Sequence, residues 1–140
     1  MDADKQAMHI AQTMMQNDAY SQWLGMELLE VKQACCKVKM TVTSNMTNGF
    51  GIAHGGITYA LADSAFAFAC NSHGRKSVSV ETSISHTAPV QTGDELIAVA
   101  TELSLSNKIG VYQIVITCNN KTVALFKGTC YRTSKHWALS

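Results

Sequence analysis

The stretch from Gly55 to Cys70 constrains the fold of this chain more than any other segment. Ala, Leu, Ile, Phe and Tyr occupy it around the whole circumference of a helix, and its only charged residue is Asp63. A helix that is apolar on every side has to be buried inside a protein. Turn-forming residues follow at Asn71 and Gly74, and glycine is typical of the position just past a helix end. We therefore predict a buried helix over residues 55–70.

The segments around this helix predict one more helix and six strands. Residues 4–17 carry apolar side chains at helical spacing and predict a surface helix, whereas a cluster of turn formers at 43–53 predicts a loop. Strands are predicted at 28–31, 36–42, 77–84, 97–105, 111–118 and 122–131. The last four have no helices between them and should pair antiparallel. The expected fold is α+β, a hotdog fold in which an antiparallel sheet wraps around the central apolar helix.

Composition limits the classes of partner. A chain of 140 residues with 15% charged residues and a formal net charge of +1 predicts a single domain over residues 1–140, without a basic surface for nucleic acid. The N-terminus carries Asp2 and Asp4 where a signal peptide would be basic, and no apolar run reaches the roughly 18 residues of a membrane span. We expect a soluble, cytoplasmic protein that binds neither nucleic acid nor membrane.

The cysteines and tryptophans are expected to have structural roles. The five cysteines are an odd number without a C-x-x-C pair, which favours reduced thiols. Cys70 and the histidines at 54, 73 and 86 lack a recognised metal-ligand spacing, so no metal site is predicted. Trp23 and Trp137 are expected to pack near the termini.

Asp63 is the only Asp, Glu, Lys or Arg between Lys39 and Arg75. A carboxylate among apolar neighbours loses hydration, so it must be hydrogen-bonded or have a raised pKa. This environment is typical of a catalytic base or nucleophile. The structural alternative is that Asp63 accepts a hydrogen bond from Ser64 or Thr58, or faces a polar interface.

The sequence His54-Gly55-Gly56 opens the predicted helix. The first backbone N–H groups of a helix have no internal acceptor, and the helix dipole leaves partial positive charge there. Glycine removes the side chain that would keep a ligand away. Such a helix start can hold a carbonyl oxygen as it becomes an oxyanion, although two glycines there are also typical of a plain entry turn.

The spacing of Gly55 and Asp63 predicts an oligomer. Eight positions along a helix span about 12 Å at roughly 1.5 Å per residue, whereas a nucleophile and an oxyanion donor must both lie about 3 Å from the reacting group. One helix cannot present both to one carbonyl. If both act, a two-fold dimer with antiparallel helices would bring each Asp63 to the partner's Gly55.

The central residues resemble a known family. Asn48-Gly49, His54-Gly55-Gly56 and the run from Leu61 to Gly74 are similar to the central segment of the PaaI-type thioesterases of phenylacetate degradation. Three further motifs support the resemblance, namely Thr92-Gly93-Asp94, Gly110-Val111-Tyr112 and the run from Val123 to Gly128. The similarity extends from about residue 14 to residue 132, nearly the whole chain.

The resemblance implies a hotdog-fold acyl-CoA thioesterase, a homotetramer built from two homodimers, without metal or redox cofactor. It implies substrates of the (hydroxy)phenylacetyl-CoA type, or a similar aryl-acyl-CoA. Ser85-His86-Thr87-Ala88-Pro89 departs from the family, which often has an acidic and an aromatic residue followed by Arg-Pro at this point. The acyl pocket and nearby CoA contacts are therefore expected to differ.

The resemblance also assigns site residues. It carries the catalytic carboxylate to Asp63 and the oxyanion donor to the Gly55 N–H, with Asn48 orienting the thioester or the attacking water and His54 as a hydrogen-bonding partner. Ser79 matches a serine that assists the water in related animal enzymes.

The remaining candidates are predicted to bind substrate. They are Gly56 beside the oxyanion donor, Thr82 as the alternative to Ser79, and the cations Lys108 and Arg75 as contacts for the pantetheine or the nucleotide phosphates. Each cation has the alternative interpretation of a solvated charge at a turn or strand end.

Two questions remain open at the level of sequence. Asp63 is predicted either to deprotonate water or to attack the thioester directly. Alternative functions are a hotdog 3-hydroxyacyl dehydratase, with His54 as acid and base, and a non-catalytic acyl-CoA-binding protein. Such binding proteins usually lack the carboxylate, and the proline-rich pattern of the dehydratases is missing here.

Overall fold

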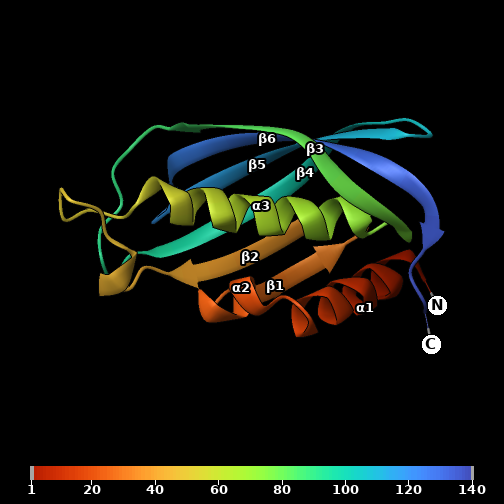
Figure 1. Ribbon diagram of the computed structural model, residues 1–140, viewed down its shortest axis with the longest axis horizontal. Coiled ribbons are helices and arrows are strands. Elements are labelled where there is room, and N and C mark those ends of the chain that lie inside the picture. Colours follow the sequence, from red (N-terminus) through yellow and green to blue (C-terminus); the bar gives the residue numbers. More distant parts are fainter. Residues whose placement is uncertain (1, 140) are drawn as a thin grey trace.

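The computed structural model describes residues 2–139, which form a curved six-stranded sheet with helices on its inner side. The elements are α1 (Ala3–Gln16), α2 (Ala19–Trp23), β1 (Glu27–Lys32), β2 (Cys35–Thr41), the 3-10 helix η1 (Ser44–Met46), α3 (Gly55–Asn71), β3 (Arg75–His86), β4 (Glu95–Leu105), β5 (Ile109–Cys118) and β6 (Lys121–His136). The strand order is β1-β2-β4-β5-β6-β3, and every neighbouring pair is antiparallel. The predicted α+β hotdog arrangement is confirmed, with α3 lying along the concave side of the sheet (Figure 1).

The alternating pattern of the strands places one set of side chains against α3. In β4, Leu96, Ala98 and Ala100 are fully buried, and the equivalent positions of β2 and β5 behave in the same way. Burial at every second residue is what a sheet with one covered face requires. All five cysteines are free thiols, as predicted.

Helix α3 has defined caps at both ends. The His54 side chain caps its start, and Gly74 (φ +102°) turns the chain into β3 after its end. Asn71, the last helical residue, donates to Ser77 O (3.2 Å) and accepts from Ser77 N (2.9 Å) and from Trp137 Nε1 (2.9 Å). Trp137 therefore packs at the helix end, as expected for a tryptophan near the terminus.

The short helix α2 was not predicted. It begins after Asp18, whose carboxylate accepts from Ser21 N (3.0 Å), and Ser21 Oγ is hydrogen-bonded to Ser64 Oγ of α3 (2.7 Å). Five residues are too few to show a helical period, although an aspartate cap and Gly25 bracket them. The expectation that Trp23 packs near the terminus is wrong, because 74% of its surface is exposed on α2.

Strand β3 forms one edge of the sheet. It pairs with β6 on one side, and no strand of the described chain pairs with its other side. Val78 and Val80 are more than half exposed on it, near a bulge between Ser79 and Glu81. An apolar edge of this kind is a surface on which another chain can add. No helix within residues 2–139 has the length and hydrophobicity needed to span a membrane.

Gly128 in β6 allows α3 to approach the sheet closely. A Cβ atom at this position would lie 2.8 Å from two ring carbons of Phe66, which is itself buried. The Phe66 ring is held between Tyr112 and Phe126, with ring centroids 5.8 and 6.0 Å away. It therefore has little room to move.

We predict that Gly128→Ala destabilises the protein by about 1–3 kcal/mol, the usual cost of overpacking a core. Urea denaturation at a fixed protein concentration measures the change. Gly49→Ala is the matched control, because nothing lies within 4 Å of its Cβ position. Equal stability of the two variants would contradict the packing argument.

Candidate active site

Asp63 lies in the middle of α3 on the side of the helix that the sheet does not cover. Most α3 side chains are buried. Residues three or four positions apart on one side of the helix are the exception: Gly56 is exposed, and Tyr59, Asp63 and Ala67 are partly buried. The pKa of Asp63 is raised, first by burial and second by the negative charge of Asp18. Asp63 is therefore partly removed from water, yet a ligand or a second chain can still reach its carboxylate.

The two hydroxyl groups expected as alternative partners of Asp63 are bonded elsewhere. Ser64 Oγ pairs with Ser21 Oγ, and Thr58 Oγ1 donates to Gly55 O (3.1 Å). Within residues 2–139 the Asp63 carboxylate has no hydrogen-bond partner. The structural alternative of a carboxylate held by Ser64 or Thr58 is therefore wrong.

The start of α3 leaves one backbone N–H free. The Gly56 N–H donates to His54 Nδ1 (2.8 Å), and the Ile57 N–H donates to His54 O (3.0 Å). The Gly55 N–H has no acceptor in the described part of the chain. Of the two glycines, Gly55 is thus the one whose N–H can bind a ligand.

His54 is the N-cap of α3. Its Nδ1 accepts a hydrogen bond and is therefore unprotonated, which puts the proton of the neutral ring on Nε2. Its backbone N–H donates to Met46 O (2.8 Å). His54 consequently orders the helix start and has no free acceptor nitrogen in the neutral form.

A cavity of about 440 Å³ lies on one side of the helix start, lined by Asn48, Gly55, Thr58 and His86 among others. Asn48 Oδ1 accepts from Phe50 N (2.9 Å), so its carboxamide nitrogen is the unused polar group. The structure thus brings two predicted site residues, Asn48 and Gly55, to one cavity.

His86 was not predicted to belong to this site. Its ring lies against Gly55, since a Cβ there would be 3.2 Å from His86 Cε1, and its Nε2 lies 3.0 Å from Thr58 Oγ1. Thr58 donates its one hydroxyl hydrogen to Gly55 O, so it accepts from His86 Nε2, and Nδ1 of the neutral ring is left as an acceptor. No local sequence signal reveals this contact, because it depends on where the end of β3 meets α3.

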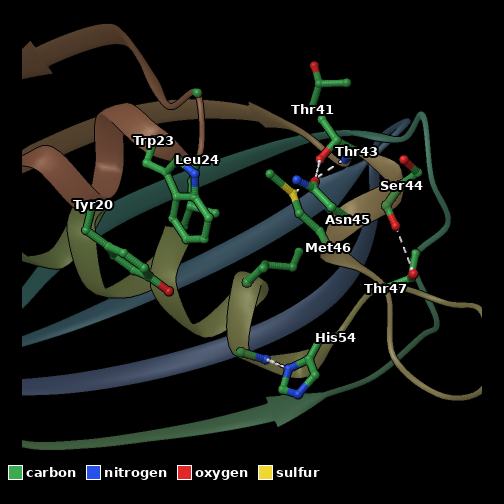
Figure 2. A pocket seen from close by; sticks show the side chains of 13 residues that line it. Tyr20, Trp23, Leu24, Thr41, Thr43, Ser44, Asn45, Met46, Thr47 and His54 are labelled. Carbon is green, nitrogen blue, oxygen red and sulfur yellow. Dashed lines mark hydrogen bonds between the residues drawn. The ribbon is translucent and has the colours of Figure 1, made fainter.

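A larger cavity of about 820 Å³ lies on the other side of the helix start. Figure 2 shows the rings of Tyr20 and Trp23 extending from α2 toward the space faced by Met46 and His54. Gly56 and Ile57 of α3 also line it. The first turn of α3 therefore has a cavity on each side, and Gly55 lines the smaller of the two.

The predicted residues on β3 lie apart from Gly55 within one chain. Ser79 is exposed near the bulge of the free edge, and Thr82 Oγ1 is hydrogen-bonded to Tyr59 Oη (2.5 Å). Neither Ser79 nor Thr82 lines the two cavities. Tyr59, four residues before Asp63 on the same side of α3, was missed, although its spacing from Asp63 is the signal that could have found it.

The two predicted cations lie beyond the opposite end of α3. The Arg75 guanidinium donates to Thr133 O (3.1 Å), Arg132 O (3.1 Å) and the Asn107 side chain (3.0 Å). It joins the start of β3 to β6 and to the turn between β4 and β5. Lys108 is exposed in that turn. Neither cation approaches Gly55 in the same chain.

Comparison with known proteins identifies the family. The thioesterase superfamily matches residues 50–125. The acyl-coenzyme A thioesterase PaaI of Escherichia coli is 40% identical over 123 residues, which cover 87% of this chain and 88% of that protein. A putative esterase of Archaeoglobus fulgidus is 39% identical over 123 residues, covering 87% of this chain and 80% of its own.

The solved structure of the E. coli PaaI protein, from the phenylacetic acid degradation operon, superposes on the chain with a TM-score of 0.94 at 38% sequence identity. The superposition covers 96% of this chain and 99% of that one. The predicted resemblance, fold and enzyme class are therefore confirmed: the chain belongs to the thioesterase superfamily of thioester hydrolases and has the hotdog fold of the PaaI-type enzymes.

Proposed function

We propose that the protein hydrolyses acyl-CoA thioesters at sites shared between two subunits. The observation that carries this proposal is the pair of unsatisfied groups on α3, namely the Gly55 N–H and the Asp63 carboxylate. They are eight residues apart on one helix, about 12 Å along its axis, and thus too far apart to act on one carbonyl. Each group needs its counterpart from a second chain.

A two-fold dimer through β3 supplies that counterpart. The hydrogen bond between Tyr59 and Thr82 joins α3 to β3 one helical turn before Asp63, which puts Asp63 near the free strand edge. A partner that covers the edge with its own β3 would also face Asp63, and two-fold symmetry makes the α3 helices antiparallel. The family resemblance adds a pair of such dimers as the proposed homotetramer.

In the proposed reaction the Gly55 N–H holds the thioester oxygen. In one route Asp63 of the other subunit takes a proton from water, the water oxygen bonds to the carbonyl carbon, and the CoA thiolate leaves and is protonated. In the other route the carboxylate attacks the carbon, the thiolate leaves, and water opens the resulting anhydride. In both, negative charge develops on the oxygen bound to Gly55, where the helix dipole stabilises it.

The remaining candidates have supporting roles in the proposal. Asn48 lines the cavity next to Gly55 and would donate from its carboxamide to the thioester or the water. Ser79 and Thr82 lie on β3 and would approach the site of the other subunit. Lys108 and Arg75 would lie near the partner's substrate in an antiparallel dimer, and Lys108, whose charge is exposed, is the better candidate for a phosphate contact.

Two observations favour hydrolysis over the alternatives. The dehydratase alternative uses His54 as acid and base, but the acceptor nitrogen of His54 is engaged by the Gly56 N–H. A non-catalytic acyl-CoA-binding protein does not need a half-buried, unpartnered carboxylate. (Hydroxy)phenylacetyl-CoA or a similar aryl-acyl-CoA, in phenylacetate degradation, is the substrate proposed from the similarity to PaaI.

We predict that Asp63→Asn lowers kcat for phenylacetyl-CoA hydrolysis by at least about a thousandfold while substrate binding is retained. The asparagine removes a desolvated charge, so the melting temperature should not fall. Release of free thiol measures turnover, and equilibrium binding of phenylacetyl-CoA provides the control. Near-normal kcat in the variant would remove Asp63 from the mechanism.

Gly55→Pro tests the backbone donor. Proline is tolerated at the first position of a helix, so the variant deletes the N–H while keeping the helix, and kcat should fall about 10²–10³-fold. Gly55→Ala is the matched control: it adds a Cβ near His86 but keeps the N–H, so it should lose clearly less activity than Gly55→Pro. Equal losses in the two variants would indicate a steric effect instead.

Mixing these variants tests the shared site. After subunit exchange, Asp63→Asn and Gly55→Pro chains in equal amounts should recover about a quarter of wild-type activity, because half of the dimers are mixed and each has one intact site. Gel filtration confirms that the dimers form. No recovery from mixed dimers would mean that both groups act within one chain.

We predict that Asp18→Asn moves the acid limb of the kcat/KM profile to lower pH. Asp63 must be ionised to act, and loss of the Asp18 charge lowers the raised pKa of Asp63. Asparagine still caps α2. Asp2→Asn, which changes the cap of α1, is the control and should leave the profile unchanged. A shift in both variants, or in neither, would contradict this electrostatic coupling.

A further inference from the structure

The large cavity between α2 and the start of α3 has the features of an acyl-binding pocket. Its volume of about 820 Å³ lies within the range of roughly 300–1,000 Å³ found for small-molecule sites. Leu24, Met46 and Ile57 are buried apolar residues that line it, while the side chains of the η1 loop give it a polar rim. An apolar interior with a polar rim suits an acyl chain whose thioester remains at the opening.

The wall on the α2 side is aromatic. Tyr20 and Trp23 are 53% and 74% exposed, and their ring centroids lie 6.1 Å apart at an interplanar angle of 43°. Figure 2 shows both rings extending from α2 into the cavity. Two large aromatic side chains left exposed together mark a binding surface. The Tyr20 hydroxyl has no hydrogen-bond partner within residues 2–139 and is available to a polar substituent.

This wall is held in place before any ligand binds. Asp18 caps α2, the Ser21 hydroxyl is bonded to Ser64 of α3 (2.7 Å), and Gln22 Nε2 donates to Met15 O (2.7 Å). The helix is therefore fixed to both α1 and α3, so the rings extend from a rigid turn. A rigid aromatic wall loses little conformational entropy when a ring stacks on it.

The two cavities lie on opposite sides of the first turn of α3, so the two ends of a bound thioester can extend in opposite directions. Gly56 and Ile57 face the aromatic cavity, whereas Gly55 and Thr58 face the smaller cavity with His86. These positions lie on different sides of the first helical turn. A thioester bound across this turn can thus extend its acyl group into the cavity lined by Gly56 and its sulfur and pantetheine into the cavity lined by Gly55, where His86 Nδ1 can accept from an amide N–H.

We propose that Tyr20 and Trp23 determine specificity for an aromatic acyl group, which binds in the large cavity against their rings. This inference rests on the proposed thioesterase function and adds the location and the selectivity of the acyl site. The aromatic faces favour a planar ring over an alkyl chain of similar size, because stacked ring pairs contribute beyond the area they bury.

The test compares two acyl groups with the same number of carbon atoms, phenylacetyl-CoA and octanoyl-CoA. Trp23→Leu keeps an apolar side chain but removes the aromatic face, and it should lower the phenylacetyl-to-octanoyl ratio of kcat/KM about fivefold. Trp23→Phe should keep the ratio within about twofold of wild type. Leu103→Ala, at an exposed residue outside this cavity, is the control and should change neither rate.

Two results would overturn the inference. An unchanged ratio in Trp23→Leu would show that the ring does not meet the acyl group. An equal loss for both substrates, with a change in oligomeric state by gel filtration, would show that Trp23 is a subunit contact instead. The failure of the proposed function is distinguishable, because the wild-type protein would then release no thiol from either substrate.

Discussion

The hydrogen bond from the Gly56 N–H to His54 Nδ1 fixes the start of α3, and the geometry of the site depends on it. The bond satisfies one of the first N–H groups of the helix and leaves the preceding N–H, that of Gly55, as the free donor. It also engages the acceptor nitrogen of the histidine, so His54 caps the helix through this atom. Asp63 is then the carboxylate of α3, and it has no hydrogen-bond partner within residues 2–139.

Helix α3 has two different environments around its circumference. Most of its circumference packs on the sheet, where Gly128 lets the Phe66 ring approach β6, while Asp63 is only partly buried. One turn before Asp63, the Tyr59–Thr82 hydrogen bond joins α3 to β3, the strand with the free edge. In the proposed dimer, burying this surface against a second copy would complete both the sheet and the site.

The sequence predicted the architecture because the signals for it are local. Uniform apolarity located α3 to within one residue of its observed end, and alternation located the six strands, although β3 and β6 extend further than their apolar runs. Helix α2 and the exposure of Trp23 were missed, since a five-residue helix has no period and depends on its hydrogen bond to Ser64.

The site was predicted in part. Three candidate residues have local signals. Asn48 lies in a run of turn formers, Gly55 is one of two glycines at a helix start, and Asp63 is an isolated charge in an apolar segment. His86 had no such signal, because its position depends on a tertiary contact between β3 and α3. Tyr59 had only its four-residue spacing from Asp63, and its contact with Thr82 could not be predicted locally. The roles proposed for Ser79 and Thr82 depend on a second chain, whose position no local sequence pattern encodes.

The bond between Ser21 and Ser64 has a consequence for how the two proposed sites are connected. Within one subunit it links α2, which carries Trp23, to the residue next to Asp63. In the proposed dimer Trp23 belongs to one active site and Asp63 to the other. The aromatic wall proposed for one site and the helical turn that carries the carboxylate proposed for the other are thus joined by a single hydrogen bond between two serine hydroxyls.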